Sequence, residues 1–299
     1  MNVIALDAGQ TGIRAQLRVD DVVVREVETP GVLTDRPVVP QLAAVVAAVE
    51  PLAGTTLAVG SSGLGSEITA SELLDHVRDV GITRVLLAHD SITSYLGALG
   101  DEPGVVIASG TGVVTLAVGA DSLARVDGWG HLIGDAGSGF WIGRAAFDAV
   151  LRAHDGRGPA TALTDAIRAD FPDLEDAYLV LQADTSRVSR IASWARTVAE
   201  LASTDAVARR ICEQAADELA ASVIAGLTRV GQANRPDPLV STLGKVFHGE
   251  VLADEFARVL RDRFPELRLV APAGTGLDGA AAMASLSASS PFWQRISSS

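Results

Sequence analysis

The sequence predicts an α/β protein with two similar lobes and a cleft between them. Strand-like and helix-like segments alternate through the first hundred residues in the order β-β-β-α-β-α-β-α. A glycine-rich turn interrupts the opening strands in "VIALDAGQTGIRAQL", residues 3–17, and a similar turn recurs in "GVVIASGTGVVTLAV", residues 104–118. A supersecondary unit that appears twice in one chain indicates a duplicated architecture.

The individual elements follow from periodicity and from turn residues. In the first copy we expect strands at 2–7, 13–19 and 21–28, followed by helix 41–52, strand 55–60, helix 71–80, strand 83–88 and helix 91–99. In the second copy we expect three strands within 104–128, a mostly helical stretch at 138–233, strand 238–244, helix 250–264, strand 267–272 and a final helix from about 277. The predicted N-terminal lobe is 1–102 with a C-terminal helix at about 287–299, and the predicted C-terminal lobe is 103–286.

Composition excludes several classes of protein. The chain has 299 residues, 48% of them hydrophobic, which is enough for a substantial core. Its formal charge of −13 argues against a nucleic-acid partner, and no apolar run approaches the ~20 residues that a membrane helix needs. Cys212 is the single cysteine, so an intramolecular disulfide or a multi-thiolate metal site within one chain is excluded. We expect a cytoplasmic protein without a membrane partner.

The first glycine-rich turn carries the parts of a phosphate site. Without a Cβ, Gly9 lets a phosphate approach the backbone N–H groups, and the hydroxyl of Thr11 adds a donor. Asp7 ends the strand, where a carboxylate can hold a hydrated Mg²⁺. A polar hairpin turn remains the alternative for this segment alone.

The second turn, "SGTG" at 109–112, offers the same chemistry through Gly110, Thr111 and Gly112. Two matching turns, each opening one lobe, favour a nucleotide clamp over two unrelated polar hairpins.

Asp90 stands where a predicted strand ends and a helix begins. One interpretation is a helix N-cap, a common use of aspartate that contributes ~1 kcal/mol. The other is a general base that takes the proton of an attacking hydroxyl at the ligand-binding edge of the sheet.

The segment "GWGHLIGDAGSGFWIG", residues 128–143, is too irregular for a strand and too rich in glycine for an ordinary connection. Backbone N–H groups next to a carboxylate suit a polyhydroxylated ligand, because they pair with neighbouring sugar hydroxyls. The alternative is structural, with Trp129 as a core anchor, His131 as a satisfied histidine and Asp135 as a helix cap.

These motifs resemble, in order, the segments of the BadF/BadG/BcrA/BcrD ATPase family, and within it the N-acetylglucosamine kinases. The resemblance rests on Asp7-x-Gly9-x-Thr11, Asp90, "ASGTG", "GWGHLIGDAGS" and "STLGKVF", and it covers nearly the whole chain. It implies the two-lobed actin-like ATPase (ribonuclease H-like) fold, with duplicated units that close on ATP and a sugar.

The resemblance also implies roles for individual residues. Thr11 and Thr111 would contact the ATP phosphates and Asp7 would organise Mg²⁺, while Asp90 would be the catalytic base. The family's sugar pocket would be lined by Gly128, Trp129, Gly130, His131 and Asp135. The family's adenosine site would be bordered by Ala215, Gly244 and Lys245, although Lys245 also fits an ordinary surface lysine. A homodimer is expected.

The sequence departs from the family pattern at three places. Gly12 stands where a lysine or arginine usually follows the threonine of the first phosphate loop, and Gln10 stands where a glycine is usual. A phosphate contact is therefore either missing or supplied by Arg14. The loop "TPGVLTDR" lacks the usual asparagine that contacts the sugar. N-Acetylglucosamine, glucosamine, N-acetylmuramic acid, N-acetylmannosamine and glucose therefore all remain candidate acceptors.

The leading hypothesis is an ATP-dependent kinase that phosphorylates the 6-hydroxyl of N-acetylglucosamine or a close amino sugar. A second is an ATPase activator of a reductase or dehydratase, but those family members bind an iron–sulfur cluster with two cysteines from each subunit, which Cys212 alone does not supply. A third is a sugar-sensing protein without catalysis.

Overall fold

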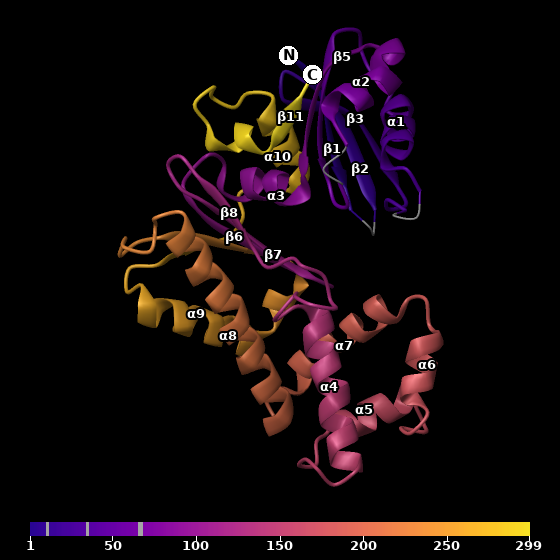
Figure 1. Ribbon diagram of the computed structural model, residues 1–299, viewed down its shortest axis with the longest axis vertical. Coiled ribbons are helices and arrows are strands. Elements are labelled where there is room, and N and C mark those ends of the chain that lie inside the picture. Colours follow the sequence, from indigo (N-terminus) through magenta and orange to yellow (C-terminus); the bar gives the residue numbers. More distant parts are fainter. Residues whose placement is uncertain (10–11, 34–35, 65–67) are drawn as a thin grey trace. The chain divides into compact units, whose positions relative to one another are not determined.

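The computed structural model describes residues 1–9, 12–33, 36–64 and 68–299, so the predicted phosphate ligand Thr11 lies outside the described residues. The chain forms two compact units (Figure 1). Unit 1 comprises Met1–Pro103, Val118–Leu123 and Ala271–Ser299, and unit 2 comprises Gly104–Ala117 and Ala124–Val270.

The sheet of unit 1 is built around the opening strand, β1 (Asn2–Ala8). On one side β1 pairs antiparallel with β2 (Ile13–Val19), which pairs antiparallel with β3 (Val22–Thr29). On the other side β1 pairs parallel with β4 (Thr55–Ser61), and β4 pairs parallel with β5 (Ile82–His89). The short strand β11 (Ile296–Ser298) completes the edge beside β5, which gives the order β11-β5-β4-β1-β2-β3.

Helices cover both faces of this sheet. Ile4 and Leu6 of β1 belong to one core cluster with apolar residues of α1 (Val38–Ala48) and α2 (Ala70–Val77). The opposite face of β1 and β4 contacts α10 (Gly276–Met283), which packs against α3 (Asp90–Leu99). Strands covered on both faces read as almost continuous apolar runs, and β1 and β4 do so.

Unit 2 repeats the same strand order. Its first strand, β6 (Gly104–Ser109), pairs parallel with β9 (Leu239–Leu243), and β9 pairs parallel with β10 (Arg268–Val270). On the other side of β6 lie β7 (Val113–Val118) and β8 (Leu123–Val126), which gives the order β10-β9-β6-β7-β8. When the first five strands of each sheet are numbered by their order in the chain, their order across both sheets is 3-2-1-4-5. The predicted duplication is confirmed.

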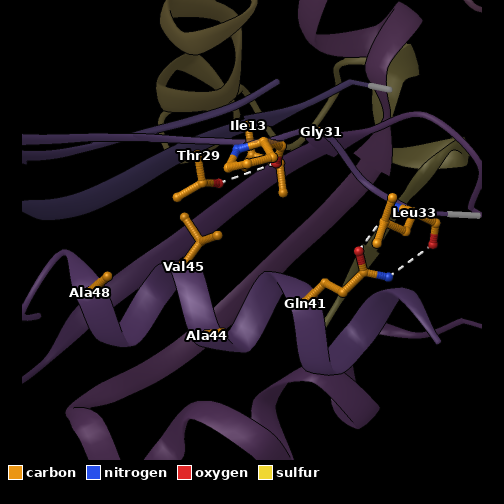
Figure 2. A pocket seen from close by; sticks show the side chains of 9 residues that line it. Ile13, Thr29, Gly31, Leu33, Gln41, Ala44, Val45 and Ala48 are labelled. Atoms are coloured by element: carbon orange, nitrogen blue, oxygen red, sulfur yellow. Dashed lines mark hydrogen bonds between the residues drawn. The ribbon is translucent and has the colours of Figure 1, made fainter. Parts of the chain in front are cut away.

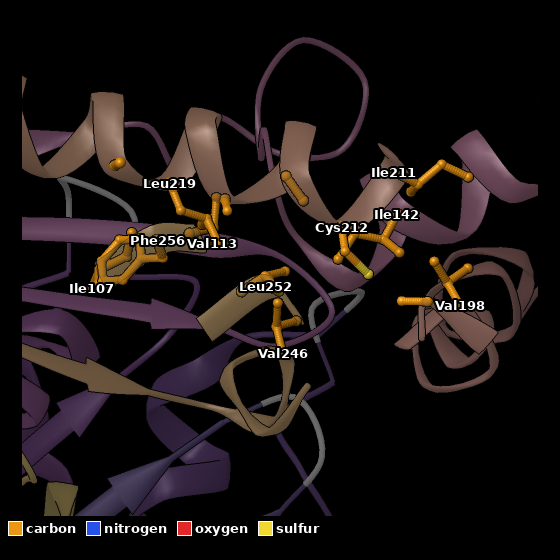
Figure 3. Packing of buried hydrophobic residues seen from close by; sticks show 14 of the residues in the cluster. Ile107, Val113, Ile142, Val198, Ile211, Cys212, Leu219, Val246, Leu252 and Phe256 are labelled. Carbon is orange, nitrogen blue, oxygen red and sulfur yellow. The ribbon is translucent and has the colours of Figure 1, made fainter. Parts of the chain in front are cut away.

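The helices of unit 2 enclose a single apolar core. Residues of β6, β7, α4, α8 and α9 meet there, including Ile107, Val113, Ile142, Leu219 and Phe256 (Figure 3). The helices are α4 (Gly139–His154), α5 (Leu163–Asp170), α6 (Ala177–Ala183), α7 (Arg187–Leu201), α8 (Ala206–Arg229) and α9 (Glu250–Arg263).

Two glycines allow α3 and α10 to cross in backbone contact. A Cβ on Gly97 would lie 1.9 Å from the carbonyl oxygen of Thr275, and a Cβ on Gly279 would lie 1.8 Å from that of Thr93. No side chain fits at either position, so this crossing requires glycine on both helices.

The C-terminal segment differs from the expectation of a helix at about 287–299. The helix α10 ends at Met283, residues Pro291–Gln294 form a single 3₁₀ turn, and Ile296–Ser298 form β11. The turn begins with a serine cap followed by Pro291, a residue that fits the first turn of a helix and is unfavourable in its interior. The chain rejoins unit 1 already at Ala271, because α10 packs on α3.

Within the described ranges, no helix combines the length and the apolar character that crossing a bilayer requires.

Candidate active site

Asp7 is held near the end of β1 by its neighbours in unit 1. It faces Arg14 across the β1–β2 ladder, and the Arg14 guanidinium lies 3.4 Å from one carboxylate oxygen. Burial raises the pKa of Asp7, Arg14 opposes this rise, and the charge of Asp90 adds to it. Arg14, which the departure at Gly12 singled out as a substitute phosphate ligand, thus contacts Asp7 in this structure.

The start of α10 covers the same carboxylate. A Cβ on Gly276, the first residue of α10, would lie 2.8 Å from Oδ2 of Asp7. The glycine therefore lets the positive end of the helix approach the carboxylate, which favours its negative charge. Sequence reasoning did not connect this distant segment with Asp7.

The first predicted phosphate turn is closed by backbone hydrogen bonds. The N–H of Gly9 donates to the carbonyl of Gly12 at 3.0 Å, and the N–H of Val32 donates to the carbonyl of Gly9 at 3.0 Å. The second bond ties the loop after β3 to this turn. The role of Thr11 in phosphate contact stays a prediction.

Asp90 is the first residue of α3, and His89 is the residue that caps the helix. The Nδ1 atom of His89 accepts a hydrogen bond from the N–H of Ser91 at 3.2 Å. The same Nδ1 lies 2.8 Å from Oδ1 of Asp90. The alternative that Asp90 serves as the N-cap is therefore wrong, because the capping position is one residue earlier.

The donor set of unit 1 fits a hydrated magnesium ion. Asp7 and Asp90 lie close enough for the charge of Asp90 to raise the pKa of Asp7, and a divalent cation would relieve this repulsion. The described residues contain no group of three or more acidic, histidine or cysteine side chains that could enclose a metal. Magnesium commonly binds through one or two carboxylates, water and substrate phosphates, so the carboxylate of Asp7 suffices on the protein side.

The second turn is tied to the first turn of α4. The N–H of Gly110 donates to the carbonyl of Gly112 at 2.9 Å. The N–H groups of Gly139 and Phe140, at the start of α4, donate to the carbonyls of Gly110 and Thr111 at 2.8 and 3.1 Å. Thr111 itself is exposed, so its hydroxyl is accessible to a ligand.

Asp135 lies directly against this second turn. A Cβ on Gly112 would lie 2.6 Å from Oδ2 of Asp135, so only glycine admits the carboxylate here. Oδ1 accepts a hydrogen bond from the N–H of Gly130 at 3.1 Å. Burial is the largest cause of the raised pKa of Asp135, the charge of Asp127 adds to it, and backbone N–H donors oppose it. The helix α4 is capped by Ser138, so Asp135 is not a helix cap.

Asp127 was not predicted as a site residue, yet it contacts both ends of the predicted sugar loop, residues 128–135. Its Oδ1 accepts from the N–H of Asp135 at 2.8 Å and from that of Trp129 at 3.5 Å, and its Oδ2 accepts from the N–H of Ala136 at 2.9 Å. The only sequence signal was an aspartate immediately before "GWG".

The tip of this loop is exposed. Trp129 is 57% exposed, which excludes the alternative of a core anchor, and the Arg125 guanidinium lies 4.4 Å from its ring centre. His131 contacts Phe140 of α4 edge-on, with ring centres 4.9 Å apart. Gly128 and Gly130, on either side of Trp129, both have positive φ, of 78° and 85°.

The residues predicted to border adenosine occupy different environments. Gly244, at the end of β9, abuts the second turn so closely that a Cβ would lie 2.1 Å from the carbonyl oxygen of Ser109. Lys245 is exposed beside it, at the start of the 3₁₀ turn Lys245–His248. Ala215 of α8 is fully buried, and its carbonyl lies under Gly137 of the sugar loop's C-terminal flank. Adenosine contact by these residues stays a prediction.

A separate apolar pocket of about 340 Å³ lies in unit 1 (Figure 2). Gln41 closes one end of it, with its side-chain amide bonded to the backbone N–H and carbonyl of Leu33. None of the predicted site residues lines it, and neither does any charged side chain. Its lining residues are Ile13, Thr29, Pro30, Gly31, Leu33, Gln41, Ala44, Val45 and Ala48.

Cys212 lies in the core of unit 2, on α8 and close to Ile142 and Ile211 (Figure 3). Burial raises the pKa of its thiol to about 11. A thiol in this setting is inert at neutral pH, because the reactive form is the thiolate.

Comparison with known proteins matches residues 7–284 to the BadF/BadG/BcrA/BcrD ATPase family. The chain belongs to this family. The match includes both glycine turns and the whole sugar loop. The resemblance that the motifs indicated is confirmed.

Two curated relatives carry sugar kinase names. The N-acetylmuramic acid/N-acetylglucosamine kinase of Clostridium acetobutylicum is 29% identical over 236 residues, which cover 77% of each chain. The N-acetyl-D-glucosamine kinase of Dictyostelium discoideum is 29% identical over 182 residues, which cover 58% of this chain and 56% of that protein.

Two solved structures share the fold of this chain. A Chromobacterium violaceum protein assigned as an N-acetylglucosamine kinase superposes with a TM-score of 0.72 at 28% identity, covering 93% of this chain and 97% of the other. A glucokinase of the ROK family from Streptomyces griseus, solved with glucose and AMPPNP, gives a TM-score of 0.57 at 18% identity, covering 95% and 99%. The two-lobed actin-like ATPase fold is confirmed.

Proposed function

We propose that this protein is an ATP-dependent kinase that phosphorylates the 6-hydroxyl of N-acetylglucosamine or a closely related amino sugar. The observation that carries the proposal is the contact of Asp135 with Gly112 within unit 2. It joins a buried carboxylate, suited to accept hydrogen bonds from sugar hydroxyls, to a glycine turn suited to phosphate. The names of the curated relatives support the same acceptor class.

In this proposal the chain's residues orient the acceptor and move one proton. Asp135 accepts hydrogen bonds from neighbouring sugar hydroxyls, and the exposed face of Trp129 packs on the apolar face of the sugar ring. Asp90 accepts the proton of the attacking hydroxyl as the oxygen bonds to phosphorus. ATP with Mg²⁺ supplies the phosphoryl group when bound, and Asp7, Thr11 and Thr111 would hold its phosphates and metal.

The other family activities have less support. An activator that holds an iron–sulfur cluster needs accessible thiolates, whereas Cys212 is the single cysteine and lies buried in an apolar core. A sugar-sensing protein would bind the same ligands without turnover.

We further propose that the protein is a cytoplasmic homodimer. Size-exclusion chromatography with light scattering tests the oligomeric state, and a dimer would have twice the chain mass of 30.9 kDa.

A coupled assay of ADP release across a panel of sugars tests the proposal. The panel contains N-acetylglucosamine, glucosamine, N-acetylmuramic acid, N-acetylmannosamine and glucose, with ATP and Mg²⁺. We expect sugar-dependent ADP release with at least one amino sugar, and no release with 6-deoxy-N-acetylglucosamine, which lacks the acceptor hydroxyl. ADP release that no sugar changes would contradict the kinase function, and binding without release would support the sensing alternative.

A further inference from the structure

The sugar loop, residues 128–135, has few internal hydrogen bonds, one of which runs from the N–H of Gly130 to Oδ1 of Asp135 at 3.1 Å. Its tip residues Leu132 and Ile133 are 85% and 86% exposed, so they contribute almost no burial. Within the tip, the N–H groups of Ile133 and Gly134 donate to the carbonyl of Gly130 at 3.2 and 2.8 Å. A loop with exposed apolar residues at its tip depends on the hydrogen bonds at its base for a defined conformation.

Asp127 supplies those hydrogen bonds. Its carboxylate accepts from one N–H at the start of the loop, that of Trp129, and from two at its end, those of Asp135 and Ala136. Neutral side chains do not replace it, because an asparagine amide offers a single acceptor oxygen where the carboxylate offers two. The loop also makes room for it, since a Cβ on Gly134 would lie 2.6 Å from Oδ1 of Asp127.

This arrangement has an energetic cost that a purely structural closure would avoid. Asp127 has φ of 55°, a conformation that non-glycine residues adopt only at a cost. Its charge also lies near the carboxylate of Asp135 and helps to raise the pKa of that group. Both costs are tolerated at the residue that fixes the backbone of Asp135, the proposed sugar acceptor.

We propose that Asp127 is a positioning residue for amino-sugar recognition, which sets the orientation of Asp135 and Trp129 by closing the base of the sugar loop. The inference rests on the proposed function. Asp127 itself touches no substrate in this account, and its effect on the sugar passes through the backbone of residues 129, 135 and 136.

Two substitutions separate this role from general stability. Asp127→Asn keeps a side chain that tolerates positive φ and one acceptor oxygen, whereas Asp127→Gly tolerates positive φ and keeps no acceptor. Asp21→Asn is the matched control, because Asp21 also has positive φ, of 67°, and lies exposed in the turn between β2 and β3.

The experiment measures KM for N-acetylglucosamine, KM for ATP, kcat, and hydrogen–deuterium exchange of a peptide spanning residues 127–138. We expect Asp127→Gly to raise the sugar KM at least tenfold and Asp127→Asn to raise it less, with the ATP KM within twofold of the unmodified protein. Exchange in the peptide should accelerate in the same order, and Asp21→Asn should change none of these values.

Equal rises of both KM values, or an unchanged sugar KM together with accelerated exchange, would overturn the inference. Unchanged exchange in Asp127→Gly would overturn it as well. If the unmodified protein neither phosphorylates nor binds any sugar of the panel, the proposed function fails and the inference about sugar recognition fails with it. The exchange data would then still report whether Asp127 closes the loop, so the two failures are distinguishable.

Discussion

The Nδ1 atom of His89 lies 2.8 Å from a carboxylate oxygen of Asp90 and accepts the hydrogen bond that caps α3. The capping function thus belongs to His89, and the carboxylate of Asp90 is left for a different task. Replacing Asp90 should therefore lower turnover and leave the N-cap of α3 in place.

Asp90→Asn should fold normally and lose at least about a hundredfold in turnover, because an amide does not take up the proton of the acceptor hydroxyl. The melting temperature should stay close to that of the unmodified protein, since the N-cap of α3 is retained. Steady-state kinetics and thermal unfolding measure the two quantities. Asp79→Asn, at an exposed position of the same unit, serves as the control. Turnover within a few-fold of normal would remove Asp90 from the mechanism.

Asp7→Asn should lose activity and gain stability at neutral pH. Burial raises the pKa of Asp7 above 3.8 in the folded state, so the folded protein binds this proton more tightly than the unfolded chain does. The ionised carboxylate therefore destabilises the fold above the raised pKa, and this cost disappears as the pH falls below 3.8. Unfolding in urea at pH 7 and near pH 3 measures the difference between the two proteins. A stability difference independent of pH would show that the burial of the charge is not its cause.

Asp135→Ala should weaken sugar binding far more than ATP binding. Losing two hydroxyl hydrogen bonds to a charged acceptor costs about 2–4 kcal/mol of sugar recognition. Asp135→Asn is the companion variant, because asparagine tolerates the φ of 59° at this position. Calorimetric titration with each ligand separates the effects. Equal losses for both ligands would assign Asp135 a structural role.

Cys212 should be unreactive in the folded protein and dispensable for activity. Its thiol has a pKa raised to about 11 and lies in the core, so a thiol reagent such as DTNB should titrate it only after unfolding. Cys212→Ser should retain turnover with a modest loss of stability. Rapid labelling of the native protein, or stoichiometric iron after anaerobic purification, would contradict this expectation.

The sequence predicts the duplicated sheets well, because apolar strands and glycine turns are local signals that recur in both halves. The C-terminal tail, residues 271–299, is predicted less well. The Ala-rich stretch from about Leu277 predicted a helix that continues toward the C-terminus, and only pairing with β5 makes Ile296–Ser298 a strand. Such pairing depends on residues more than two hundred positions away, which local pattern does not encode.

Among the site residues, too, those with a local sequence signal were predicted and those that depend on the folded structure were not. Asp7, Asp90 and Asp135 are recognisable because a carboxylate at a strand end or between glycines is unusual. Asp127 and His89 escaped notice because their roles arise from the closed loop and the helix start that they contact. Capping was one of the two interpretations of Asp90, because aspartate is a common N-cap residue, and the structure gives that position to His89.

Unit 1 is assembled from the two extremes of the chain, and this has consequences during synthesis. The helix α10 packs on α3, and β11 pairs with β5, so residues 271–299 complete a unit whose other strands emerge first from the ribosome. Unit 2, by contrast, contains no residue beyond Val270 and can fold once that residue has left the ribosome.

We therefore expect the second half of the molecule to reach its native state before the first. Until the tail appears, the face of β1 and β4 that α10 covers stays open to water and to other nascent chains. A chain that ends at residue 270, followed by an unstructured linker long enough to fill the ribosomal exit tunnel, should resist proteolysis in unit 2 and remain sensitive in unit 1 when it is stalled on the ribosome. The protein's dependence on chaperones would thus be concentrated in the interval between the emergence of residue 270 and that of residues 271–299.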